Sequence, residues 1–73
     1  MQLDTAKTTA LVVNGEKTEM SVQTLAELIA ARGFSEGEVA TALNGEFVPR
    51  AARGGTLLRK GDRVEIVAPR QGG

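Results

Sequence analysis

Two Asn-Gly pairs, Asn14-Gly15 and Asn44-Gly45, constrain the fold of this 73-residue chain most strongly. Each stands between short segments rich in apolar residues, and both residue types tolerate the positive φ that a type I′ turn requires. The first pair therefore predicts a β-hairpin within residues 8–20. The second separates residues 39–44 from residues 46–49. The alternation of residues 39–44 is typical of a strand, although the alanines among them are also common in helices.

A single helix is predicted between these two pairs. Thr24 and Glu27 have the spacing of a capping box, in which the threonine hydroxyl accepts from an early backbone N–H and the glutamate reaches back to the cap. Gly33 is suited to end the helix in a left-handed conformation. The side of the helix expected to face the core consists of residues spaced i, i+3, i+4 and i+7, which are Leu25, Leu28, Ile29 and Arg32. The first three are apolar, and the stem of the arginine can extend their surface.

The remaining segments complete an α+β order. After a polar bend at residues 35–37 come the strands already described, a loop of small residues at 50–55, a turn at 60–62 and a final strand at 63–68. In this last strand, alternation places Val64 and Ile66 toward the core and Val67 on the outer side. We expect a ubiquitin-like β-grasp: a mixed sheet of four to five strands, with the final strand near its centre, packed on one main helix. We expect residues 1–73 to form one domain with a flexible tail at 70–73.

Composition limits the chemistry that this chain can perform by itself. It has no Cys, His, Trp or Tyr, which excludes a thiol nucleophile, a Ser-His-Asp relay and a zinc-finger site. Nine Lys and Arg balance nine Asp and Glu, which argues against nucleic-acid binding. A domain of this size buries only about 60% of its unfolded surface, so an interior active-site cleft is difficult to accommodate. We expect a cytoplasmic protein that acts through partners, with no metal, bound cofactor or membrane segment, and that is not an enzyme.

The chain finishes with Gly72-Gly73. Glycine lacks a Cβ, so such a tail can lie extended in a narrow tunnel and present its carboxylate to another protein's active site. The competing interpretation is an incidental pair or a linker remnant, since two glycines occur there by chance in roughly 0.5% of chains.

Several motifs occur together in an order and spacing that resemble the ThiS family, the sulfur carriers of thiamine biosynthesis. They are VNGE at 13–16, TLAEL at 24–28, ALNGEFVPR at 42–50, LRKGDRVEIV at 58–67 and the diglycine end. The resemblance covers nearly the whole chain, and residues 44–50 are its most specific part. One departure is the run of small residues after Arg50, where family members often carry a bulky residue.

This resemblance implies that the protein is a covalent co-substrate. An E1-like adenylyltransferase similar to ThiF would use ATP to adenylate Gly73, and sulfur from a persulfide enzyme would then replace one carboxylate oxygen. The resulting thiocarboxylate would donate sulfur to a thiazole synthase similar to ThiG. Gly72 would keep the approach to Gly73 uncrowded, while Gln71 and Arg70 complete the tail.

Phe47 and Val67 are the candidate contacts for a partner on the sheet, unless residues 50–56 cover them. Three alternatives to the sulfur carrier of thiazole formation stay open. The chain could be a molybdopterin-synthase small subunit, which shares the fold and the thiocarboxylate. It could be a protein modifier that forms isopeptide bonds through Gly73, or a plain interaction module with an incidental tail.

Overall fold

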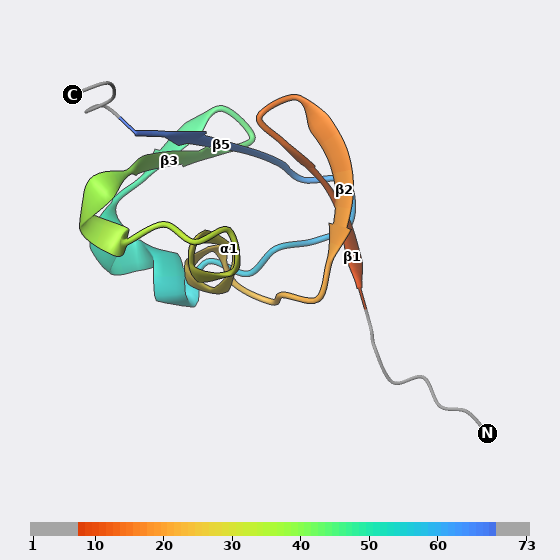
Figure 1. The fold of residues 1–73 in the computed structure, drawn as a ribbon. Helices are drawn as coiled ribbons and strands as arrows, with labels where there is room; N and C mark the ends of the chain where they lie inside the picture. The colour runs from red at the N-terminus through yellow and green to blue at the C-terminus, as the bar shows by residue number, and fades with distance from the viewer. Residues whose placement is uncertain (1–7, 69–73) are drawn as a thin grey trace.

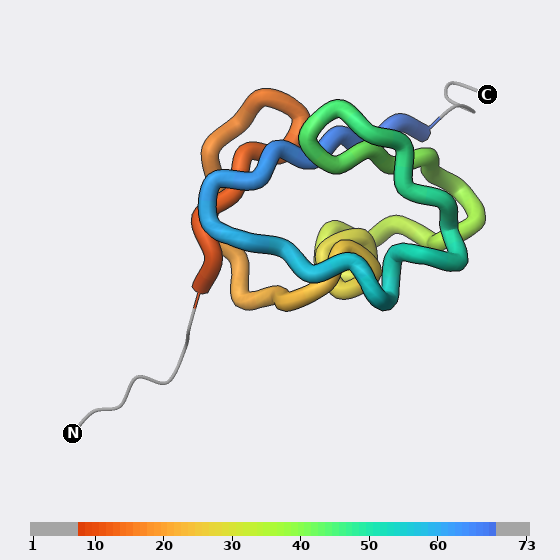
Figure 2. The backbone as a smooth tube through the Cα atoms, turned by 180° about the vertical axis from the view of Figure 1, so that it is seen from behind, coloured from red at the N-terminus to blue at the C-terminus, as the bar shows by residue number. Residues whose placement is uncertain are grey.

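A computed structural model describes residues 8–68 of the chain. Five strands form one mixed sheet in the order β2-β1-β5-β3-β4, and helix α1 lies across one face of it (Figure 1). Seen from behind, the same two layers are evident, with the strands on one side and the helix on the other (Figure 2). The predicted β-grasp fold is confirmed. The elements are β1 (Thr9–Val13), β2 (Glu16–Met20), α1 (Leu25–Ala31), η1 (Glu36–Glu38), β3 (Ala40–Leu43), β4 (Glu46–Val48), η2 (Arg50–Gly55) and β5 (Arg63–Val67).

Both Asn-Gly pairs form the predicted turns. Asn14 and Gly15 have φ of 51° and 85°, and Asn44 and Gly45 have φ of 51° and 87°. These positive values match the type I′ requirement and join β1 to β2 and β3 to β4 as antiparallel pairs. The two hairpins therefore follow directly from local sequence.

The final strand, β5, lies between the two hairpins, as predicted. It runs parallel to β1, pairing Val12 with Arg63, and antiparallel to β3, pairing Ala40 with Val67. Since β5 has a neighbour on each side, it is the strand that joins the two hairpins into one sheet.

Helix α1 begins at the predicted cap. The N–H of Glu27 donates to Thr24 Oγ1 at 3.1 Å. The hydrogen bond of the Glu27 carboxylate differs from that of the expected capping box. The carboxylate accepts from the N–H of Gln23 at 2.7 Å, one residue before the cap, and not from the N–H of Thr24. Gly33 follows the helix with a φ of 84°, in the left-handed conformation that was expected.

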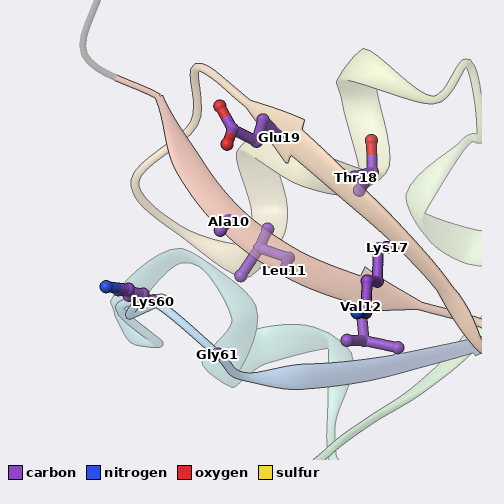
Figure 3. Close-up of a pocket in the computed structure, with 8 residues that line it drawn as sticks. All are labelled: Ala10, Leu11, Val12, Lys17, Thr18, Glu19, Lys60 and Gly61. Atoms are coloured by element: carbon purple, nitrogen blue, oxygen red, sulfur yellow. The ribbon is translucent and has the colours of Figure 1, made fainter.

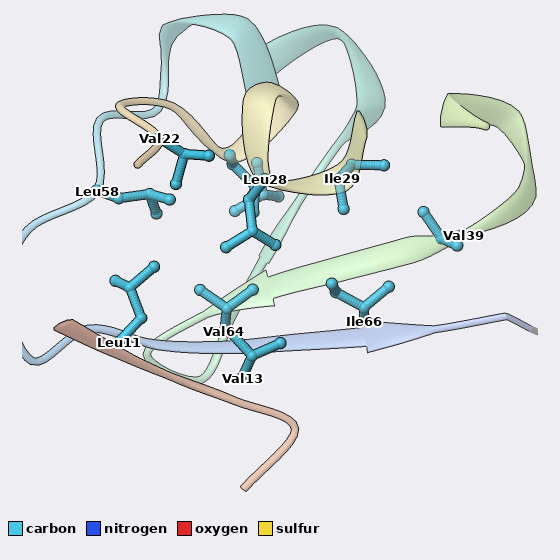
Figure 4. Close-up of a cluster of buried hydrophobic side chains, with 11 residues drawn as sticks. Leu11, Val13, Val22, Leu28, Ile29, Val39, Leu58, Val64 and Ile66 are labelled. Atoms are coloured by element: carbon cyan, nitrogen blue, oxygen red, sulfur yellow. The ribbon is translucent and has the colours of Figure 1, made fainter. Parts of the chain in front are cut away.

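The core fills the space between α1 and the sheet (Figure 4). Leu25, Leu28 and Ile29 are fully buried, which confirms the apolar part of the predicted helix face, whereas Arg32, expected to extend it, is exposed. Val64 and Ile66 meet them from β5, so the alternation assigned to that strand is also confirmed. Among residues 8–68, the buried hydrophobic residues are Leu11, Val13, Val22, Leu25, Leu28, Ile29, Val39, Val48, Leu58, Val64 and Ile66.

Two segments interpreted as irregular are short 3-10 helices. The predicted bend at residues 35–37 overlaps η1, for which Ser35 is the N-cap, and the predicted loop at 50–55 is η2. The position of η2 depends on Arg53, which is only 2% exposed. Its guanidinium donates to Thr41 Oγ1 at 3.0 Å and to the carbonyls of Val39 at 2.7 Å and Glu36 at 2.8 Å. These contacts hold η2 against the segment that enters β3.

Candidate functional site

The tail and the strand that leads to it form the candidate site. Strand β5 ends at Val67, and the predicted site residues Arg70, Gln71, Gly72 and Gly73 lie outside the described residues. The assignment of adenylation and thiocarboxylation to Gly73 therefore stays a prediction. What the structure defines is the end of β5 that precedes these residues.

The end of β5 is held from both sides. On one side Val67 pairs with Ala40 of β3. On the other side the side chain of Asn14 contacts Ile66: the Ile66 N–H donates to Asn14 Oδ1 at 2.8 Å, and Asn14 Nδ2 donates to the Ile66 carbonyl at 3.2 Å. Sequence reasoning assigned Asn14 to the turn alone. Gly would also satisfy the turn, so the presence of an Asn at position 14 is the only local feature of the sequence that points to this second contact.

Phe47 and Val67 both lie exposed on the outer face of the sheet, with 70% and 58% of their surface accessible. The exposure expected for Val67 is thus confirmed. Ala42 is the register partner of Phe47, and Ala40 is that of Val67. The small alanines leave a hollow of about 260 Å³ between the larger residues, which is also lined by Glu65. Around this hollow the outer face of β3, β4 and β5 is apolar apart from the Glu65 carboxylate, and Arg63 lies on the same face at the start of β5.

The alternative in which residues 50–56 cover Phe47 and Val67 is wrong. Arg53 donates to Thr41 Oγ1, and Thr41 is buried on the inner face of β3. These contacts hold η2 on the same side of the sheet as α1, where Figure 1 also shows it. The outer face consequently has no covering element among residues 8–68.

A second hollow, of about 550 Å³, lies over β1 and β2 (Figure 3). Ala10 and Val12 line it together with Lys17 and Lys60. The Gly61 N–H donates to the Ala10 carbonyl at 2.8 Å, so this hollow lies beside the start of β5. It is therefore at the opposite end of the strand from the tail.

Residues 8–68 contain no group of three or more acidic side chains placed to bind a metal ion together. Within the same residues, no helix has the length and apolar character needed to cross a bilayer. The features that single out a site are therefore the strand end beside Asn14 and the apolar outer face.

The family model for the ThiS family matches residues 5–73, a range that includes the diglycine. This chain belongs to the ThiS family. A crystal structure described as thiamine biosynthesis protein ThiS from Geobacter metallireducens is 31% identical, with a TM-score of 0.74, over 88% of this chain and 99% of that one. A solution structure of a thiamine biosynthesis protein from the same organism is 32% identical, with a TM-score of 0.74, over 88% of this chain and 87% of that one. A search of curated proteins finds no significant match.

Membership of the ThiS family confirms the resemblance found in the sequence motifs. Together with the two similar structures, it supports a sulfur-carrier role connected with thiamine biosynthesis. The β5 end and the outer face are therefore considered below as parts of a ThiS-family carrier.

Proposed function

We propose that this chain carries sulfur as a thiocarboxylate on Gly73 and delivers it for thiazole formation. The observation that carries the proposal is the match to the ThiS family, which extends through Gly72 and Gly73. The fold supports it, because the residues that follow β5 leave from the central strand of the sheet. A carrier of this kind is a co-substrate, and the catalytic groups belong to its partners.

The chemistry of loading follows from the low reactivity of a carboxylate. An oxygen of the Gly73 carboxylate attacks the α-phosphorus of ATP on the activating enzyme, and pyrophosphate leaves. The terminal sulfur of a persulfide then attacks the acyl carbon. The bond from this carbon to the bridging oxygen breaks, and AMP leaves with that former carboxylate oxygen. A thiol cleaves the sulfur–sulfur bond of this acyl disulfide, which leaves a thiocarboxylate on Gly73 and a disulfide between the two thiol partners. ATP is used by the activating enzyme, and the carrier itself binds no cofactor.

The tail residues contribute by what they lack. Gly72 and Gly73 have no Cβ, so a narrow channel can admit them and the acyl carbon stays open to attack. Gln71 and Arg70 link this pair to the folded body, and we assign them to the entrance of the partner's channel. Replacing Gly72 by a bulky residue is expected to block loading without affecting the folded body.

The outer face of the sheet is the proposed docking surface for the activating enzyme, an E1-like adenylyltransferase similar to ThiF. Phe47 and Val67 are exposed apolar side chains on that face, and Val67 ends the strand that leads to the tail. A partner that covers this surface would bury both side chains, and apolar area removed from water contributes about 25 cal/mol per Å² to binding. The thiazole synthase similar to ThiG would receive the loaded tail afterwards.

Intact-protein mass spectrometry tests the proposal. The purified chain is incubated with ATP, a persulfide donor and the adenylating enzyme of its source, in parallel with a variant lacking Gly73. The expected result is a mass gain equal to the exchange of one oxygen for sulfur, in the full chain only. Loading of the shortened variant, or no loading of the full chain while a control carrier is loaded, would contradict it.

The acceptor is tested with the loaded protein. Transfer of sulfur to thiazole synthase, and none to the large subunit of molybdopterin synthase, is expected. The opposite preference would assign the chain to the molybdopterin pathway, and higher-mass conjugates of the chain in cells would instead identify a protein modifier.

A further inference from the structure

The parallel pairing between β1 and β5 is continued by a side chain after β1 has ended. The register pairs Val13 with Val64, and the N–H of Asn14 donates to the Val64 carbonyl at 2.8 Å. Asn14 then takes a φ of 51° and turns toward β2, so its own main chain leaves the ladder. Its carboxamide occupies the next position, where Oδ1 accepts from the Ile66 N–H and Nδ2 donates to the Ile66 carbonyl. An amide side chain thus replaces a peptide group of a strand.

The contact between the Asn14 side chain and Ile66 is the last one that β5 makes on the side facing β1. Asn44 exchanges two hydrogen bonds with Arg63, which shows that Arg63 faces β3. Main-chain groups alternate between the two neighbours of a strand, so Val67 also faces β3 and Ile66 faces β1. Among residues 8–68, the hydrogen bonds from Asn14 are the final ones between β5 and the β1–β2 hairpin. Their partners are 52 residues apart in the sequence.

Asn44 uses the same arrangement at the other end of β5. It also has a φ of 51°, its N–H donates to the Arg63 carbonyl at 2.7 Å, and its Oδ1 accepts from the Arg63 N–H at 2.9 Å. Its Nδ2 donates to Asp62 Oδ1 at 3.0 Å. The two turn asparagines therefore hold opposite ends of β5, Asn44 at its start and Asn14 at the end that leads to the tail. The type I′ turn accounts for an Asn at both positions but not for the hydrogen bonds that each carboxamide makes with residues 62–66.

We propose that Asn14 is a positioning residue for sulfur loading: its carboxamide holds the end of β5 in the conformation that the activating enzyme binds. This role rests on the proposed function. Without the two hydrogen bonds, the strand end takes the competent conformation only part of the time. The apparent affinity of the activating enzyme for the carrier falls in proportion to the population of the competent conformation. Its KM for the carrier should therefore rise by roughly fivefold while kcat stays unchanged.

The test compares Asn14→Gly with Asn44→Gly. Both substitutions preserve the positive φ and both remove a carboxamide that contacts β5, so Asn44→Gly controls for general loss of stability. Hydrogen exchange of the Ile66 amide should accelerate in Asn14→Gly, whereas that of Arg63 should accelerate in Asn44→Gly. In loading assays followed by mass spectrometry, KM should rise for Asn14→Gly only. Asn14→Asp keeps an acceptor for the Ile66 N–H but places a carboxylate oxygen against the Ile66 carbonyl, so it should also raise the KM, and it takes the place of Asn14→Gly if that variant proves poorly folded.

Equal KM values for the two glycine variants, with the unaltered chain loading normally, would overturn the positioning role and leave the proposed function standing. Unchanged exchange at Ile66 in Asn14→Gly would overturn it as well, independently of any enzyme. Failure of the unaltered chain to load would refute the proposed function and, with it, the role assigned to Asn14.

Discussion

The two faces of the sheet show that burial is decided by what covers a face and not by residue type. On the inner face of β3, the polar residue Thr41 is 2% exposed, while on the outer face of β4 the aromatic residue Phe47 is 70% exposed. Thr41 is tolerated inside because its hydroxyl donates to the Val48 carbonyl at 2.9 Å and accepts from Arg53. Phe47 stays outside because α1 and η2 lie on the opposite face. The inner face therefore carries stability, and the outer face is free for a partner.

Leu28→Ala should produce the largest loss of stability on the inner side. Leu28 is fully buried, and removing such a side chain leaves a cavity that costs about 2–5 kcal/mol of unfolding free energy. Urea denaturation measures this change. Leu57→Ala is the matched control, because Leu57 is 61% exposed and its truncation should change stability by less than about 0.5 kcal/mol. Equal losses for the two leucines would refute the assignment of Leu28 to the core.

Arg53→Met should produce the second-largest loss of stability. Methionine keeps an unbranched stem but has no donors, so the buried Val39 carbonyl and the Glu36 carbonyl lose their hydrogen bonds from this side chain. We expect a loss of about 1–3 kcal/mol, measured in the same denaturation assay. Arg53→Lys should recover only part of it, since a single ammonium cannot reproduce the planar fork. Full stability of Arg53→Met would show that packing of the stem, and not its hydrogen bonds, holds η2.

Thr41→Val keeps the shape of the side chain and removes its hydroxyl. The Val48 carbonyl loses a donor and Arg53 Nε loses an acceptor, so we expect a loss of roughly 1 kcal/mol. The double variant Thr41→Val with Arg53→Met sharpens the result. Because the two residues share a hydrogen bond, their effects should sum to more than the loss in the double variant. Strict additivity would mean that they act independently.

Val67→Ser should have the smallest effect on folding, within about 0.5 kcal/mol, because Val67 is 58% exposed. Its effect should appear instead in loading, where losing the burial of apolar area against the activating enzyme is expected to raise the KM by about fivefold. Leu57→Ser, an equally exposed apolar site remote from the outer face, should leave the KM unchanged. A similar KM for both variants would exclude the outer face as the docking surface.

Local patterns predicted much of this molecule. The Asn-Gly pairs identified both hairpins, Thr24 identified the start of α1, and alternation placed Val64 and Ile66 inside and Val67 outside. These features depend on residues a few positions apart, whose chemistry determines their own backbone. They extend to the order of the elements along the chain and to a β-grasp fold with the final strand near its centre.

The features that escaped prediction depend on partners far away in the chain. Arg53 was placed in a loop because its acceptors lie 12 to 17 residues earlier, and two of them are main-chain carbonyls that carry no sequence signature. Asn14 was assigned to a turn because its second contact is 52 residues distant. The tail residues Arg70 to Gly73 lie outside the described part of the chain, so their roles rest on the family and on glycine chemistry.

The central place of β5 also bears on how the chain folds as it is synthesised. Until Arg63 to Val67 are made, the hairpins β1–β2 and β3–β4 have no strand between them, so the sheet cannot close. Contacts across such long separations are entropically costly to form, and proteins that depend on them fold slowly. A nascent chain should therefore remain sensitive to proteases until its last strand emerges from the ribosome, and only then acquire protection in a single step.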